Sequence, residues 1–310
     1  MPGGGGCIAA NDAHAMNIPP VITDGVGRHA AERVPPLLEG GPGASRRGWL
    51  VMLGLMLGYI GTMTVLAKVN GGDGPAMSGD AWTLMKETSA SLAVFAVPFL
   101  AGLACVWRGR REVWGARRHD VWTWVWGTAW FVGLRVAVAV PILVTAGVLQ
   151  LRHGAAAMEK VRGLRPKIES LMPLEALGDP WYALACATWV SFVVAGLREE
   201  LWRAAFMRGF RALFGDRHAL PTAQWTAVGV SSVLFGLAHL PQGWMGMLTT
   251  GMLGLGLGAV QVWRRSTWEA VVAHGLVDAS TFALLFVLQN PVTQRWLHLP
   301  PDFARQVLGG

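Results

Sequence analysis

The stretch "GLREELWRAAFMRGF" (residues 196–210) decides how the rest of the chain is interpreted. Its first two residues close a run of eighteen, 180–197, that carries no charged side chain and has the length of a membrane-spanning helix. The next six positions hold two arginines and two glutamates: Arg198, Glu199, Glu200 and Arg203. Charged groups at the edge of a span cost free energy unless they are paired or take part in chemistry. The stretch therefore predicts polar partners elsewhere in the chain.

The composition of the 310-residue chain predicts a membrane protein. Hydrophobic residues make up 53% of it and charged residues only 15%, and its mean hydropathy is positive; soluble domains average about 25% charged residues. Uncharged windows of membrane-spanning length occur at 49–67, 88–107, 180–197 and 219–263, and the last could hold two helices. We therefore expect an all-α, polytopic membrane bundle of about seven or eight transmembrane helices.

The first 48 residues differ from the rest. Ten glycines and six prolines leave this segment too little apolar surface to offset the entropy of ordering, so a disordered tail is expected. No basic segment followed by an apolar core begins the chain, so we expect no cleavable signal peptide. Cys7, Cys105 and Cys186 show no CxxC spacing and indicate neither disulfides nor a zinc site.

Arginines beside the first two spans predict their orientation. Arg46 and Arg47 precede the first span, and five arginines follow the second within 108–118. By the positive-inside rule both flanks, and with them the N-terminal tail, lie in the cytoplasm. The net charge of +7 is then a topology signal, and we expect no nucleic-acid partner.

Two segments allow more than one interpretation. The apolar run 121–151, interrupted by Arg135 and Pro141, could be one long tilted helix or a span with an interfacial piece. Segment 152–179 carries five basic residues, although simple alternation places it outside. A surface-lying amphipathic helix or an uncounted span in 121–151 would resolve this conflict.

Further helices are expected from Trp181 to about Leu213 and at 224–240, 244–263 and 268–288. The segment "GMLGLGLG" (251–258) has a superficial similarity to a phosphate-binding loop. It lies inside an uncharged span, however, and Gly254 and Gly258 have the spacing of close helix packing, which we favour.

The later half of the chain contains three pairs of residues four positions apart. Such pairs share one face of a helix. They are Glu199 with Arg203, Phe235 with His239, and His274 with Asp278. Glu199 and Arg203 could be only an ion pair, and His239 could be a helix-end histidine bonded to the backbone. Asp278 needs a partner or a proton because it lies inside an apolar span, and His274 is the nearest candidate.

Together these residues could activate water for hydrolysis. A carboxylate can take a proton from water, imidazoles can position it, and a cationic group can stabilise an oxyanion. His239, His274 and a carboxylate, Glu199 or Asp278, could instead hold a divalent metal such as zinc with one position open. GxSxG and HExxH are absent, and Ser231 and Ser232 have no evident base.

Residues 180–285 resemble the CAAX protease and bacteriocin-processing family, that is, the type II CAAX prenyl endopeptidases or Rce1-like proteins. The resemblance rests on "EELWR", "FGLAH" and "HGLVD" in that order, and on the lead-in "STWEAVVAHGL". It implies a helical bundle with a polar cavity inside the membrane. It also implies a catalytic core at 180–290, between an N-terminal membrane region at 49–179 and a C-terminal tail at 291–310.

The resemblance also implies roles for the motif residues. Glu199 or Glu200 would be the general base, and His239, four residues after Phe235, would help to hold the attacking water. His274 and the residue four beyond it would stabilise the oxyanion. Arg203 would keep the glutamates ionised.

The chain departs from the family pattern at two places. Two residues separate Glu200 from Arg203 where the family has three, and Asp278 stands where the family has asparagine. An ionised aspartate would repel an oxyanion, so Asp278 must be protonated, paired with His274, or a metal ligand.

Our hypothesis is an intramembrane endopeptidase of the metallo or the glutamate type. Its substrate would be a membrane-associated peptide or protein, and in one version of the hypothesis a prenylated one. Membrane lipids would be its other partners. The alternatives are a non-catalytic scaffold or bacteriocin self-immunity protein on the same fold, and a proton-coupled transporter.

Overall fold

The computed structural model describes residues 45–69, 77–115, 120–154, 166–214, 220–298 and 300, which all fall within one compact unit, Gly40–Gly310. In these ranges the chain is helical and contains no β-strand, only an isolated bridge between Gly115 and Ser266. The expected all-α architecture is therefore confirmed for this part of the chain. The tail predicted at 1–48 lies almost wholly outside the described residues, as do residues 301–310 of the tail predicted at 291–310.

Six helices of the described segments are long and apolar enough to cross a membrane, which indicates an integral, multi-pass membrane protein. They are α1 (Arg46–Val69), α2 (Ala81–Cys105), α4 (Val121–His153), the continuous run α6, η4 and α7 within Pro180–Phe214, α9 (Gly243–Arg264) and α10 (Thr267–Gln289). The described residues thus hold six candidate spans, where seven or eight were predicted for the whole chain. The helix expected at 224–240 exists as α8 (Leu220–Ala238), but its glutamine, threonines and serines leave it outside this set. The cytoplasmic position of the tail stays a prediction.

Polar side chains at the helix starts explain several of these boundaries. Asp80 accepts from the backbone N–H of Thr83, which caps α2, and this bond holds the pKa of the exposed Asp80 carboxyl below its usual value. Asp120 and Thr123 form a reciprocal capping box at α4. Ser266, the first residue of "STWEAVVAHGL", accepts from the N–H of Glu269 and so begins α10.

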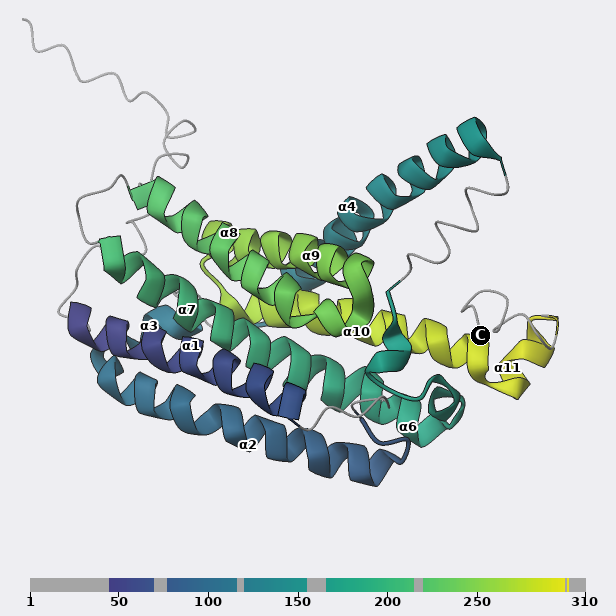
Figure 1. Ribbon diagram of the computed structural model, residues 1–310, viewed down its shortest axis with the longest axis horizontal. Coiled ribbons are helices and arrows are strands. Elements are labelled where there is room, and N and C mark those ends of the chain that lie inside the picture. Colours follow the sequence, from purple (N-terminus) through teal and green to yellow (C-terminus); the bar gives the residue numbers. More distant parts are fainter. Residues whose placement is uncertain are drawn as a thin grey trace, which may run out of the picture. The chain divides into compact units, whose positions relative to one another are not determined.

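Helices α1, α2 and α7 pack side by side, as Figure 1 shows. Their shared core contains Met52 and Met56 from α1, Phe95 and Phe99 from α2, and Phe206 from α7. This core packs α7 against α1 and α2, and so fixes the glutamates at the start of α7 relative to those two helices.

The run from α6 (Pro180–Ala185) to α7 (Arg198–Phe214) is continuous, which confirms the predicted helix from Trp181 to about Leu213. Its middle is a π-helix, η4 (Cys186–Leu197), with a Ser191 hydroxyl donating to the carbonyl of Cys186 at 2.8 Å. A π-helix bonds i to i+5, so residues after it are rotated relative to a regular α-helix. The α-helical period of the span therefore does not predict which way Glu199 and Glu200 face.

Two glycines allow η4 and α10 to approach closely. A Cβ added at Gly275 of α10 would lie 2.4 Å from the ring of Phe192 in η4. One added at Gly196 would lie 3.0 Å from the carbonyl oxygen of Val271. The end of η4 therefore lies directly against the turn of α10 that carries His274.

Glycines also bring α8 and α9 together. A Cβ at Gly254 would lie 3.1 Å from the ring of Phe235, and one at Gly258 would lie 2.8 Å from Val228. This confirms close helix packing as the function of "GMLGLGLG".

Residues 121–153 form one 33-residue helix, α4, with Pro141 inside it, so the single-helix interpretation is correct. The amphipathic surface helix considered for 152–179 is not formed by the described residues of that segment, where 166–179 holds only short 3₁₀ turns, Ile168–Ser170 and Leu174–Gly178. Residues 155–165 lie outside the described ranges. Much of α4 exposes apolar side chains, as a helix facing lipid does: Val132, Val136, Val140, Leu143 and Val144.

Candidate active site

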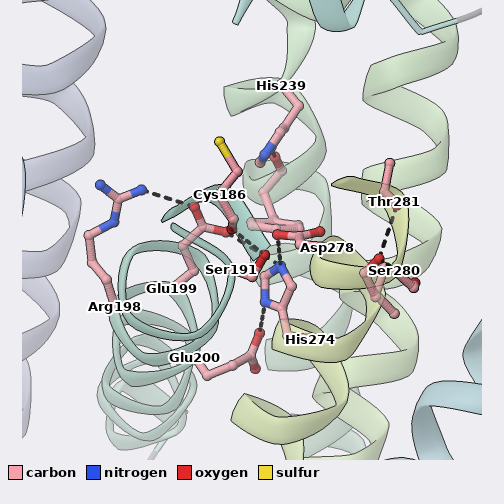
Figure 2. A network of polar contacts seen from close by, with 12 residues as sticks. Cys186, Ser191, Arg198, Glu199, Glu200, His239, His274, Asp278, Ser280 and Thr281 are labelled. Atoms are coloured by element: carbon pink, nitrogen blue, oxygen red, sulfur yellow. Dashed lines mark hydrogen bonds and ion pairs between the residues drawn. The ribbon is translucent and has the colours of Figure 1, made fainter. Parts of the chain in front are cut away.

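Three helices bring the predicted residues together (Figure 2). The start of α7 supplies both glutamates and Arg203, the end of α8 supplies Phe235 and His239, and α10 supplies His274 and Asp278. We call the set of Glu199, Glu200, His239, His274 and Asp278 the polar cluster. All of its members lie in or at the ends of apolar helices.

Glu200 is fully buried, and both of its carboxylate oxygens are occupied. Oε1 accepts from Nη1 of Arg203 and from Nδ1 of His274, the latter at 2.9 Å. Oε2 accepts from Nε2 of Gln261 in α9 at 2.8 Å. Glu200 therefore holds α7, α9 and α10 together and has no accessible oxygen with which to take a proton from water.

Glu199 has a different environment. Its side chain is 19% exposed, and Oε1 pairs with Nη2 of Arg198 at 3.0 Å. Arg198 is itself fixed by a 3.0 Å hydrogen bond from Nη1 to the hydroxyl of Ser91 in α2. Oε2 of Glu199 faces Nε2 of His274 at 3.8 Å, beyond hydrogen-bonding distance. One oxygen of Glu199 is thus available to a small molecule.

His274 lies between three carboxyl groups. Because Glu200 accepts from all of its partners, Nδ1 of His274 carries the proton of their shared bond. Nε2 is then directed to the space between Glu199, at 3.8 Å, and Asp278, at 3.7 Å. Asp278, for which His274 was the expected partner, faces Nε2 beyond hydrogen-bonding distance, and its side chain is 30% exposed.

Phe235 is the common neighbour of three other motif residues. The guanidinium of Arg203 lies over its ring at 4.5 Å, and the rings of His239 and His274 meet it edge-on at 4.7 and 5.9 Å. Nδ1 of His239 bonds the carbonyl of Phe235 at 2.8 Å. The prediction that His239 is a helix-end histidine bonded to the backbone is therefore correct for Nδ1. Figure 2 shows its ring directed towards the rest of the polar cluster.

The ion pairs differ from those predicted. Arg203 pairs with Glu200, three residues before it, and Glu199 pairs with Arg198 instead. One residue fewer than in the family pattern separates Glu200 from Arg203, and the two side chains still form a buried ion pair. The hydroxyls of Ser231 and Ser232 both donate to the carbonyl of Val228.

Gln261 was missed by the sequence analysis. It is buried, and its amide donates to the side chain of Glu200 and, at 3.2 Å, to its backbone carbonyl. A glutamine inside the otherwise uncharged window 219–263 was the available signal, since a buried amide needs partners.

The described side chains do not fit a metal. Among them, no group of three or more His, Cys, Asp or Glu residues is arranged to hold a metal ion. His239, His274, Glu199 and Asp278, the ligands considered above, are therefore not brought into a coordination set, and the metalloprotease version gains no support from this geometry.

The fold and the cluster define a helical membrane protein with carboxylates, histidines and arginines held between its spans. Residues 180–280 match the family model "Type II CAAX prenyl endopeptidase Rce1-like", which confirms the resemblance based on the three motifs. The match covers about a third of the chain, and the similarity of this region to the Rce1-like CAAX endopeptidases suggests an intramembrane protease. No curated protein and no solved structure gave a significant match.

Proposed function

We propose that the protein is an intramembrane endopeptidase in which Glu199 is the general base. The observation that carries this proposal is the contrast between the two glutamates. Glu200 is buried and bonded by three side chains, whereas Glu199 keeps one carboxylate oxygen open beside His274. A general base must reach the proton that it removes, so Glu199 fits the role and Glu200 does not.

The proposed reaction uses three side chains. Glu199 takes one proton from a water molecule while the water oxygen attacks the carbonyl carbon of the scissile peptide bond. His239, at the end of α8, helps to hold that water. The carbonyl oxygen becomes an oxyanion, and His274 in its doubly protonated form donates to it from Nε2. Glu199 then gives the proton to the leaving amine as the C–N bond breaks.

Glu200, Arg203 and Gln261 support this chemistry without touching the substrate. Their buried hydrogen bonds fix Nδ1 of His274, so the direction of Nε2 is set before substrate binds. Arg203 also fixes Phe235, and through its ring the end of α8 that carries His239. The altered spacing of Arg203, which together with Asp278 would favour a non-catalytic scaffold, leaves this contact network in place.

The substrate proposed is a membrane-associated peptide, and a prenylated C-terminal segment is the version that the family name suggests. The test uses purified protein in liposomes with quenched fluorescent peptides that are either farnesylated or lipid-free. We expect cleavage by wild type, loss on Glu199→Gln, and a preference for the farnesylated peptide. Equal turnover by wild type and Glu199→Gln would refute the role of Glu199, and cleavage of neither peptide would count against the protease.

A further inference from the structure

A third arginine reaches the polar cluster from outside the matched region. Arg135 is the only charged residue between Asp120 and Arg152 in the sequence, near the middle of the apolar helix α4. An arginine at this depth is costly unless it faces the bundle and has partners. Its position outside residues 180–280 means that the family match says nothing about it.

Within the described ranges, the side-chain hydrogen bonds of Arg135 all go to α10. Its Nη2 donates to the carbonyl of Val277, to the hydroxyl of Ser280 at 2.6 Å and to that of Thr281 at 2.5 Å. The preceding residue, Leu134, packs into the core that α4 shares with α9 and α10. The guanidinium is thus fixed on one turn of α10.

Asp278 lies on that same turn. Thr281, three positions later, is its neighbour on the helix surface, and His274 lies one turn earlier. Figure 2 shows Ser280 and Thr281 beside Asp278 and His274. Arg135 and Asp278 also attract each other electrostatically, and the other charged or titratable groups that act on Asp278 are His274, Glu199 and His239.

The arginines and carboxylates of the site can then be matched one to one. Arg198 pairs with Glu199, Arg203 pairs with Glu200, and Arg135 remains for Asp278. Where the family pattern has a neutral asparagine, this chain has a carboxylate, so it needs one more positive charge than that pattern does.

We propose that Arg135 is a positioning residue that holds the Asp278 turn of α10 and provides the counter-charge for the Asp278 carboxylate. Its effect on catalysis rests on the proposed endopeptidase function, but its effect on stability does not. Arg135 and Asp278 act as one unit in place of the single neutral asparagine.

The first test is a double-mutant cycle on thermal unfolding of the purified protein in detergent, with Arg135→Gln, Asp278→Asn and the double variant. We expect each single variant to unfold at a lower temperature than wild type, because it leaves one charge unpaired. The double variant should be more stable than the sum of the two single losses predicts. Additive losses, or no loss in either single variant, would overturn the proposal whether or not the protein is a protease.

The second test measures peptide cleavage in liposomes. Arg135→Gln should lower kcat/KM on the order of tenfold, as expected for a lost hydrogen bond to a charged group. Arg135→Lys, which keeps the charge, should retain most activity, and adding Asp278→Asn to Arg135→Gln should restore part of it. Arg152→Gln removes the same charge from an exposed position on the same helix and should act like wild type.

Two results of the second test would contradict the role of Arg135. One is equal loss in the Lys and Gln variants, since that outcome reports packing and not charge. The other is a double variant no better than Arg135→Gln. If wild type cleaves neither peptide while the stability cycle shows coupling, the proposed function fails and the pairing of Arg135 with Asp278 stands.

Discussion

Replacing each glutamate by glutamine should separate their roles, because the same isosteric change meets two different environments. In Glu200→Gln the carboxylate that accepts from Arg203, Gln261 and His274 becomes a neutral amide. Arg203 is then a fully buried cation without a counter-charge. Breaking a buried ion pair from one side costs about 3–5 kcal/mol, so we expect a large loss of thermal stability.

Glu199→Gln should have the opposite pattern. The ion pair between Glu199 and Arg198 is partly exposed, with side-chain exposures of 19% and 18%, and such pairs contribute about 0–1 kcal/mol. The fold should therefore survive. Cleavage should fall by about 10²–10⁴, the usual contribution of a general base, because an amide cannot take the proton from water.

The assay combines the unfolding temperature in detergent with the initial cleavage rate in liposomes for wild type and both variants. Glu175→Gln, a change at an exposed position in the 3₁₀ turn Leu174–Gly178, serves as a matched control for the substitution itself. If Glu199→Gln unfolds while Glu200→Gln remains as stable as wild type, the division of roles between the two glutamates is wrong. Wild-type cleavage by Glu199→Gln would be equally damaging.

Three further outcomes are expected. Gln261→Leu should lower the free energy of unfolding by about 1–3 kcal/mol, because it leaves a carboxylate oxygen of Glu200 unpaired. A denaturant titration in which this variant is as stable as wild type would contradict this. Gly275→Ala should cost about 1–3 kcal/mol by overpacking against Phe192, and Phe192→Ala in the same chain should recover part of the loss in a melting experiment. Because the polar cluster does not form a ligand set, peptide cleavage should persist in the presence of a chelator, and elemental analysis should find far less than one metal atom per chain. Loss of cleavage in chelator that added zinc restores would contradict this expectation.

Local sequence patterns predicted most of the helices and most of the site. Uncharged runs of spanning length gave the positions of α1, α2 and α9, because lipid admits few charges in a helix. The three motifs predicted which side chains form the polar cluster. They did so because polar groups in an apolar span are costly and so mark positions where partners meet.

Several features could not be found this way, because each depends on a contact between segments distant in the chain. The i,i+4 spacing favoured Glu199 as the partner of Arg203, but Glu200 is the glutamate that Arg203 contacts. Both spacings are compatible with a helix. The choice between them depends on where His274 and Gln261 lie, and the spacing within α7 contains no information about those helices.

The amino-acid sequence by itself determined that this is a polytopic helical membrane protein with charged and imidazole groups inside its apolar spans. Hydropathy and charge are properties of individual residues, so the printed chain carries them in full. Only the tertiary structure decided that Glu200 is bonded on both oxygens and Glu199 is not, and that Arg135 from α4 bonds the turn of α10 that carries Asp278. The physical reason is that these differences arise from how closely helices approach, which glycines such as Gly275 permit and which no single segment specifies.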